Sequence, residues 1–250
     1  MNEIKSRKNP LSVHMKSLGA GKEYRKKTGE FLCDGIKLFH EAIACSIEIT
    51  CVFTCERDIY EAQSDKNIFL VPKDILTYVS PLKTPQSILF SCKIPEISPP
   101  RQCHKAIVLE NLQDPGNVGT IIRTANAFCM DAVILTGDCA DLYNPKTIRA
   151  AMGAVFRQTV LTLSGDELWS YIESQGLKLY GTGLANSAVS PVKADFKNAA
   201  VAIGSEGRGL SDELMERCRS IIKIPMNPVC ESLNAGVAAS VIMWEMYKGN

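Results

Sequence analysis

The sequence predicts an α/β protein of two domains, the second of which is built on a parallel sheet covered by helices. Apolar runs and helix-like segments alternate after Lys105, as expected where strands are buried on both faces and joined by helices. A proline-rich stretch from Ile94, without apolar periodicity, separates these alternating segments from a smaller α/β unit that precedes them. We therefore expect an N-terminal domain over 1–95, a linker over 96–104 and a C-terminal domain over 105–250.

The elements of the N-terminal domain follow from short apolar runs. Strands are predicted at IEITCVFTC and SILFSCKI, and a helix is predicted over KLFHEAIAC. FLCDG and NIFLV are further short apolar elements of this unit.

In the C-terminal domain the same pattern predicts strands at KAIVLE, AVILT, KLYGTG, AAVAIGS and IIKIP, with a further apolar segment at FRQTVLTL. Helices are predicted from about Val118, near Asp166, after Ser211 and from Ala235. Ligands of such sheets bind beyond the carboxyl ends of the strands, so polar residues that follow these strands are the candidate site.

Charges are nearly balanced, with a formal net charge of +1, so any contact with nucleic acid depends on local clusters of lysine and arginine. The first 30 residues hold such a cluster: Lys5, Arg7, Lys8, Lys16, Lys22, Arg25, Lys26 and Lys27. A solvated helix face would also account for it. Because cations far outnumber acids there, we favour contact with RNA phosphates.

Ten cysteines are scattered without regular spacing, and no apolar leader precedes them. This favours reduced thiols in a cytoplasmic protein over a disulfide framework. Cys51 and Cys55 lack a second pair and a nearby histidine, so we expect no metal site. No apolar run reaches the length of a membrane span, so we expect a soluble protein with no membrane partner.

A glycine-rich segment, GSEGRGL from Gly204 to Leu210, follows the strand AAVAIGS. Its glycines permit positive φ and a close approach of a ligand to the backbone, and Ser211 is expected to cap the next helix. A tight strand–helix connection would use the same residues. The spacing is neither GxGxxG nor that of a Walker loop, which disfavours enzymes that use nicotinamide cofactors or nucleoside triphosphates.

Two further polar segments are expected at the same edge of the sheet. Ser232 and Asn234 precede the final helix, where they would cap it and also face the space beyond the strand ends. In DPGNVGTIIRTANAF, Asp114 to Gly116 predict a turn and Asn117 predicts the helix N-cap. Arg123 would be an ordinary surface arginine, or would hold an RNA phosphate in a forked contact.

Together these segments resemble the motifs of the SpoU (TrmH-like) family of RNA ribose 2′-O-methyltransferases, in the SPOUT superfamily. NVGTIIRTA is similar to the first motif, GSEGRGL to the second, and IPM with SLNAGVAAS to the third. The stretch DLYNPKTIRAAMGAVFR is similar to the central region of the family. NPLSVHMKSL and YRKKTGEFLCDGIKLFHEA resemble its small RNA-substrate-binding domain, which is built like kink-turn-binding ribosomal proteins.

The resemblance implies a C-terminal domain with a deep trefoil knot that holds S-adenosyl-L-methionine in a bent form. It assigns cofactor binding to Thr182, Gly204, Ile224 and Leu233. It assigns functional roles to the polar residues Asn117, Arg123, Glu206, Ser232 and Asn234. It also implies a homodimer through the C-terminal domain, in which Arg123 would serve the cofactor of the partner.

The resemblance also bears on the reaction. A guanidinium is a poor proton acceptor at neutral pH, so Arg123 is expected to hold the target phosphate and to polarise the 2′-hydroxyl. The proton acceptor stays open: Glu206 is a candidate base, or it only orients Asn117 or the loop. Pro228 stands where the family often has glycine, and Ala235-Gly236 replaces the usual Val-Ser, but neither change removes a polar functional group.

The expected substrate is a structured RNA, with ribosomal RNA ahead of transfer RNA, because an additional domain suits recognition of a large RNA by its shape. Two alternatives remain open: an RNA-binding or ribosome-assembly protein without catalysis, and a methyltransferase that modifies a base. The intact set of polar residues weighs against the first, and the SLN sequence of the third motif against the second.

Overall fold

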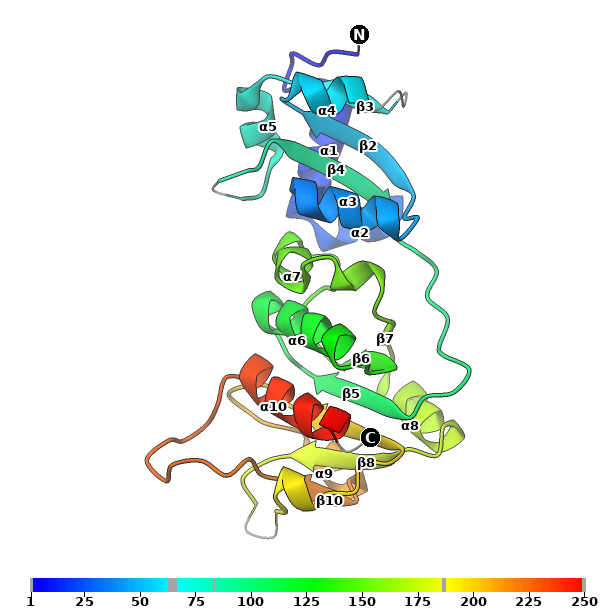
Figure 1. The fold of residues 1–250 in the computed structure, drawn as a ribbon, viewed down its shortest axis with the longest axis vertical. Coiled ribbons are helices and arrows are strands. Elements are labelled where there is room, and N and C mark those ends of the chain that lie inside the picture. The colour runs from blue at the N-terminus through cyan, green and yellow to red at the C-terminus, as the bar shows by residue number, and fades with distance from the viewer. Residues whose placement is uncertain (1, 63–66, 83, 186–187, 249–250) are drawn as a thin grey trace. The chain divides into compact units, whose positions relative to one another are not determined.

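The computed structural model describes residues 2–62, 67–82, 84–185 and 188–248, which divide into two compact units (Figure 1). The first unit comprises described residues of Met1–Glu96 and Asp141–Phe156, and the second those of Ile97–Ala140 and Arg157–Asn250. Each unit contains a sheet with helices, which confirms the predicted α/β class.

The sheet of the first unit has the strand order β1-β4-β2-β3, antiparallel except between β2 and β3. Its strands are β1 Glu30–Asp34, β2 Ile49–Thr54, β3 Ile68–Leu70 and β4 Ile88–Lys93. Its helices in this part of the chain are α1 Pro10–Ala20, α2 Lys22–Thr28, α3 Ile36–Ala44, α4 Arg57–Ala62 and α5 Lys73–Val79. The predicted strands and α3 therefore form, and the basic N-terminal segment folds into α1 and α2.

Alternate side chains of β1 enter two different cores, because successive residues of a strand point to opposite faces of the sheet. Leu32 packs with Met15 of α1 and Ile75 of α5. Phe31, on the other face, packs with Phe39 of α3. The sheet is thus covered by helices on both faces.

The segment 141–156, which the sequence assigned to the C-terminal domain, packs with the first unit. It contains α7 Pro145–Ala151 and a 3-10 helix, Ala154–Phe156. Ile148 joins the core around Phe31, and the ring of Tyr143 lies 4.7 Å from that of Phe31. The domain boundary expected at 96–104 stays a prediction.

Arg25 holds this segment by a buried ion pair. Its side chain is 4% exposed, and its Nη2 and Nε donate to Oδ2 of Asp141 at 2.6 and 3.0 Å. Its Nη1 donates to the carbonyl oxygen of Leu18 at 2.6 Å. Arg25 is therefore not available to RNA, contrary to its inclusion in the predicted phosphate-binding cluster.

The second unit is built on a parallel sheet with the strand order β10-β8-β9-β5-β6-β7. Its strands are β5 Lys105–Glu110, β6 Ala132–Thr136, β7 Val160–Thr162, β8 Lys178–Thr182, β9 Ala199–Ile203 and β10 Ser220–Ile222. Its helices are α6 Pro115–Ala127, α8 Gly165–Ser174, α9 Asp212–Arg217, α10 Ala235–Lys248 and a 3-10 helix, Pro191–Lys193.

Helices cover both faces of this sheet. Leu168 of α8 and Leu214 of α9 pack with small side chains on one face, such as Ala106 and Ala200. On the other side, α6 and α10 pack against each other and against β6 and β9, respectively. All residues of β6 and β9 are buried, which explains why these strands are continuous apolar runs in the sequence.

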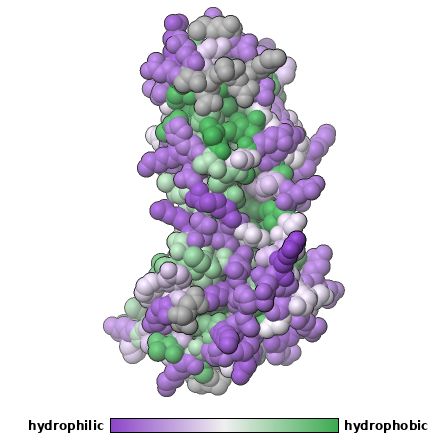
Figure 2. All heavy atoms as spheres, turned by 45° about the vertical axis from the view of Figure 1, so that its right-hand side comes forward, coloured by the Kyte–Doolittle hydropathy of each residue, from purple (hydrophilic) through white to green (hydrophobic). Residues whose placement is uncertain are grey.

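None of the described helices is long and apolar enough to cross a membrane. Hydrophilic residues cover most of the face seen in Figure 2.

Candidate active site

The three polar segments meet at one edge of the parallel sheet, beyond the carboxyl ends of its strands. The strand order reverses here, since β9 lies between β5 and β8 although it follows both in the chain. The residues after β5 lead into α6, and those after β9 form the glycine-rich segment. Ligands of open α/β sheets bind at such a reversal.

The glycine-rich loop is a closed turn with two glycines that the backbone requires. Ser205 and Gly209 exchange backbone hydrogen bonds of 3.1 and 2.9 Å. Gly209 has φ +70°, and a Cβ on Gly204 would collide with the backbone of Gly209. Gly207 has neither constraint. Closure of the loop therefore requires glycine at position 204, whether or not a ligand also contacts it.

The sequence did not single out Glu110, which anchors the end of this loop. Glu110 ends β5 and is 9% exposed. Its carboxylate accepts hydrogen bonds from the backbone N and the Oγ of Ser211, both at 2.7 Å. Oγ of Ser211 also accepts from the N of Leu214, which confirms Ser211 as the N-cap of α9. The signal in the sequence that could have identified Glu110 is its position as a carboxylate at the end of a buried strand.

Three of the predicted polar residues form one hydrogen-bonded cluster. Nδ2 of Asn117 donates to Oε1 of Glu206 at 2.6 Å, and Nδ2 of Asn234 donates to the same oxygen at 3.1 Å. Nδ2 of Asn234 is also 3.0 Å from Oδ1 of Asn117, which accepts from it. The residues come from α6, the glycine-rich loop and the start of α10, so the cluster joins the three motifs.

Asn117 is not the N-cap of α6, contrary to the prediction. The cap is Asp114, whose Oδ1 accepts from the N of Asn117 at 2.8 Å, and Pro115 and Gly116 lie in the first turn. Asn117 is therefore inside the helix, with its side chain free to join the cluster. Buried Gly236 makes room for it, because a Cβ there would lie 3.3 Å from Oδ1 of Asn117.

A cavity of about 440 Å³ lies against the other side of the glycine-rich loop. Its apolar walls include Ile203, Leu210 and Met226. Six predicted site residues line it: Thr182, Gly204, Glu206, Ile224, Ser232 and Leu233. Oγ1 of Thr182 donates to the carbonyl oxygen of Ala202 at 2.9 Å, which fixes its side chain at the end of β8.

Arg123 does not join the cluster and does not line this cavity. It is exposed on α6, and its guanidinium has no ion-pair or hydrogen-bond partner in the described part of the chain. An arginine in this state can reach a bound anion or a second molecule.

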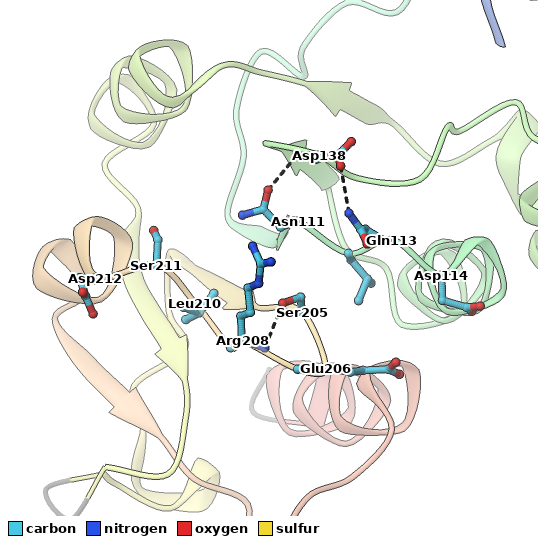
Figure 3. A pocket seen from close by; sticks show the side chains of 13 residues that line it. Asn111, Gln113, Asp114, Asp138, Ser205, Glu206, Arg208, Leu210, Ser211 and Asp212 are labelled. Atoms are coloured by element: carbon cyan, nitrogen blue, oxygen red, sulfur yellow. Dashed lines mark hydrogen bonds between the residues drawn. The ribbon is translucent and has the colours of Figure 1, made fainter.

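A second hollow, of about 670 Å³, lies beside the loop (Figure 3). It also borders Glu206, and its walls include Asn111, Gln113, Asp138 and Arg208. Arg208 lies in the glycine-rich segment, whereas sequence reasoning missed Asn111, Gln113 and Asp138, although Asn111 and Asp138 follow the predicted strands β5 and β6 closely.

Burial disfavours the thiolate form of two cysteines in this unit, Cys139 and Cys218. Burial raises the pKa of the Cys139 thiol, and burial followed by the charge of Glu110 raises that of Cys218 to about 12. No group of histidines, cysteines or carboxylates among the described residues could hold a metal ion.

Comparisons with known proteins agree with this arrangement. Residues 104–244 match the SpoU rRNA Methylase family, and residues 14–89 match the MRM3-like substrate binding domain. The chain is 32% identical over 98% of its length, and 99% of the relative, to the 23S rRNA (guanosine(2553)-2′-O)-methyltransferase RlmP of Bacillus subtilis.

Among solved structures, the AdoMet-bound rRNA methyltransferase of Sinorhizobium meliloti is similar with a TM-score of 0.89 and 25% identity, over 99% of this chain and 98% of that one. A second solved structure, which concerns 2-OH methylation of C/U34 on tRNA, is similar with a TM-score of 0.51 and 28% identity. The match covers 58% of this chain and 95% of that one.

The chain belongs to the SpoU rRNA methylase family. It is an RNA 2′-O-methyltransferase that uses S-adenosyl-L-methionine, as the sequence predicted. The residues of the 440 Å³ cavity fit this cofactor, because its size is typical of small-molecule sites and its walls are apolar. The Glu206 carboxylate at its border suits a sulfonium cation.

Proposed function

We propose that this enzyme methylates the ribose 2′-hydroxyl of a guanosine in the RNA of the large ribosomal subunit. One observation carries the proposal: similarity to the 23S rRNA enzyme of Bacillus subtilis extends over both units. The structure that concerns tRNA matches little more than half of this chain, although nearly all of its own length is aligned. An added N-terminal unit suits a large RNA that is recognised by its shape.

The proposed cofactor contacts are Thr182, Gly204, Ile224 and Leu233, which are the four predicted residues and all line the cavity. The cofactor supplies the methyl group when it is bound. Glu206 would then attract the sulfonium charge, and the amides of Asn117 and Asn234 hold its carboxylate in place. A preorganised charge of this kind does not need to reorient during the reaction.

The acceptor side is proposed to use Arg123, Ser232 and Glu206. Arg123 would hold the target phosphate and polarise the 2′-hydroxyl, which its exposure supports. Oε2 of Glu206 has no hydrogen-bond partner among the described residues, so it is the proposed proton acceptor. Ser232 lies at the cavity rim, where it would orient the ribose.

We also propose a homodimer through the second unit, in which Arg123 acts on the acceptor beside the cofactor of the partner copy. Val237, Trp244 and Tyr247 are 50, 48 and 40% exposed at helical spacing on α10. The rings of Trp244 and Tyr247 pack at a tilt against that of Phe128, next to α6, with centroids 5.6 and 5.7 Å away. Such an apolar face supports burial against a second copy. A trefoil knot near the cofactor is proposed from the resemblance alone.

RNA is proposed to contact the first unit through the exposed lysines of its first two helices, Lys16, Lys22, Lys26 and Lys27. The first unit would then act as an RNA-binding domain that resembles kink-turn-binding ribosomal proteins. Action on ribosomal RNA also supports the predicted cytoplasmic location.

The experiment is primer extension at low nucleotide concentration on ribosomal and transfer RNA from cells with and without the gene. A gene-dependent stop at one guanosine of 23S rRNA supports the proposal. A gene-dependent stop only in transfer RNA would move the substrate to the alternative class. No gene-dependent stop, with intact S-adenosyl-L-methionine binding by the protein, would favour a non-catalytic role.

A further inference from the structure

The hollow beside the glycine-rich loop has no part in the roles assigned above. Ser205 to Leu210 line both this hollow and the cofactor cavity, so one loop separates them. Glu206 borders both spaces. A ribose at Glu206 would therefore have the cofactor on one side and the hollow on the other.

Arg208 extends from the loop into the hollow toward Asn111 (Figure 3). Its backbone N donates to Oγ of Ser205 at 3.3 Å, but its guanidinium has no hydrogen-bond or ion-pair partner among the residues that the structure describes. The fork of this guanidinium is thus available to a ligand.

The amide groups of the opposite wall have defined orientations. Oδ1 of Asn111 accepts from the backbone N of Asp138 at 2.8 Å, which leaves its Nδ2 to donate. Nε2 of Gln113 donates to Oδ2 of Asp138 at 2.9 Å, which leaves its Oε1 to accept. The wall is preorganised, since Asn111 is held at φ +54° and a Cβ at Gly137 would collide with its Oδ1.

The charges in the hollow exclude a phosphate as its main ligand. Four carboxylates line it with one guanidinium, namely those of Asp114, Asp138, Glu206 and Asp212. A polyanion would be repelled, whereas a neutral group with both donors and acceptors would be favoured. A volume of about 670 Å³ accommodates a nucleobase.

We propose that this hollow receives the base of the acceptor nucleotide, turned out of the RNA fold, and that Arg208 makes it selective for guanine. An arginine fork matches O6 and N7 of guanine, and adenine would instead present its N6 amino donor to the guanidinium. Oε1 of Gln113 can accept from the N–H groups of the other edge. Enzymes that modify a base extrude its nucleotide into a pocket in this way.

The inference rests on the proposed function, so two experiments separate their failures. The first uses the full chain with S-adenosylhomocysteine at saturation, which fills the cofactor cavity, and titrates guanosine or adenosine by ligand-observed NMR. Wild type should bind guanosine more tightly than adenosine, and Arg208→Gln should lose this difference. Equal binding of the two nucleosides, or unchanged selectivity in Arg208→Gln, would overturn the inference whatever the RNA substrate.

The second experiment measures methyl transfer to transcribed 23S rRNA. Arg208→Gln should lower kcat/KM roughly 10- to 100-fold with unchanged affinity for S-adenosyl-L-methionine. Arg217→Gln, the same change at an exposed arginine outside both cavities, should have little effect. Arg208→Lys should not restore the rate, because an ammonium lacks the fork.

Full rescue by lysine would mean a simple charge contact, and loss of cofactor affinity in Arg208→Gln would mean a structural role in the loop. Either result contradicts the inference. If wild type leaves 23S rRNA unmodified, the proposed substrate is wrong, and nucleoside selectivity in the first experiment still decides the role of the hollow.

Discussion

Asn117 donates a hydrogen bond of 2.6 Å to Glu206, although 89 residues separate them in the sequence. This contact joins the first and second motifs of the family. Because Oδ1 of Asn117 also accepts from Asn234, the same side chain reaches the third motif. Residues of all three motifs are therefore joined in one polar cluster beside the 440 Å³ cavity, and its integrity can be tested residue by residue.

Asn117→Asp should lower methyl transfer at least about tenfold. The substitution removes the donor to Glu206 and places a second carboxylate beside it, and loss of a hydrogen bond to a charged group costs about 1.5–3 kcal/mol. Asn126→Asp, on the same helix, is the control, since its side chain has no hydrogen-bond partner in the described part of the chain. Equal activities of the two variants in a methyl transfer assay would contradict the role of the cluster.

Gly204→Ala should weaken binding of S-adenosyl-L-methionine more than about tenfold, because the added Cβ forces apart the turn that forms the cavity wall. Gly207→Ala is the matched control in the same loop, where a Cβ meets no atom within 4 Å. Calorimetric titration of both variants provides the comparison. If Gly207→Ala loses as much affinity as Gly204→Ala, closure of the loop is not the reason for the glycine.

The sequence predicted the parallel strands better than the contacts between them. β6 and β9 are buried along their whole length and β5 along nearly all of it, so each is a continuous apolar run with visible ends. The start of α6 was missed because Asp114-Pro115-Gly116 also suits a turn, whereas here Asp114 caps the helix and Pro115 occupies its first turn.

Interactions between distant residues could not be predicted from patterns alone. Nothing local in the sequence pairs Arg25 with Asp141, and a basic segment looks the same whether its arginine is solvated or buried. The family resemblance supplied the site residues, but not the hydrogen bonds that connect Asn117, Glu206 and Asn234, since these depend on the order of strands in the sheet.

Arg25→Ala should destabilise the first unit by about 3 kcal/mol, because it leaves Asp141 without its buried partner. Chemical denaturation followed by circular dichroism measures the loss. Lys26→Ala is the control, since Lys26 is exposed and 3.7 Å from the exposed Glu23. Equal stability of the two variants would show that the ion pair does not hold the segment 141–156.

Glu30→Gln should reduce the acid sensitivity of folding. Burial raises the pKa of Glu30, but hydrogen bonds from Lys93 and His14 lower it more, so the net pKa lies below the ordinary value of 4.5. Its ionisation therefore adds stability above that value, and this stability is lost as the pH falls through the lowered pKa.

The variant should be less stable than wild type at pH 7, and the difference should shrink between about pH 5 and 3. Glu23→Gln, at an exposed side chain, should leave the pH dependence unchanged. Denaturant titrations across this range provide the measurement. A constant difference at all pH values would contradict the proposed linkage.

The central claim is methyl transfer to an RNA ribose with Arg123 on the acceptor side. The most direct measurement incubates purified wild type and Arg123→Ala with 23S rRNA and methyl-labelled S-adenosyl-L-methionine, then maps bonds that resist alkaline cleavage. Wild type should protect one bond, 3′ of a guanosine, and Arg123→Ala should protect none while it binds the cofactor normally. Label in an alkali-sensitive nucleotide, or full activity of Arg123→Ala, would contradict the account.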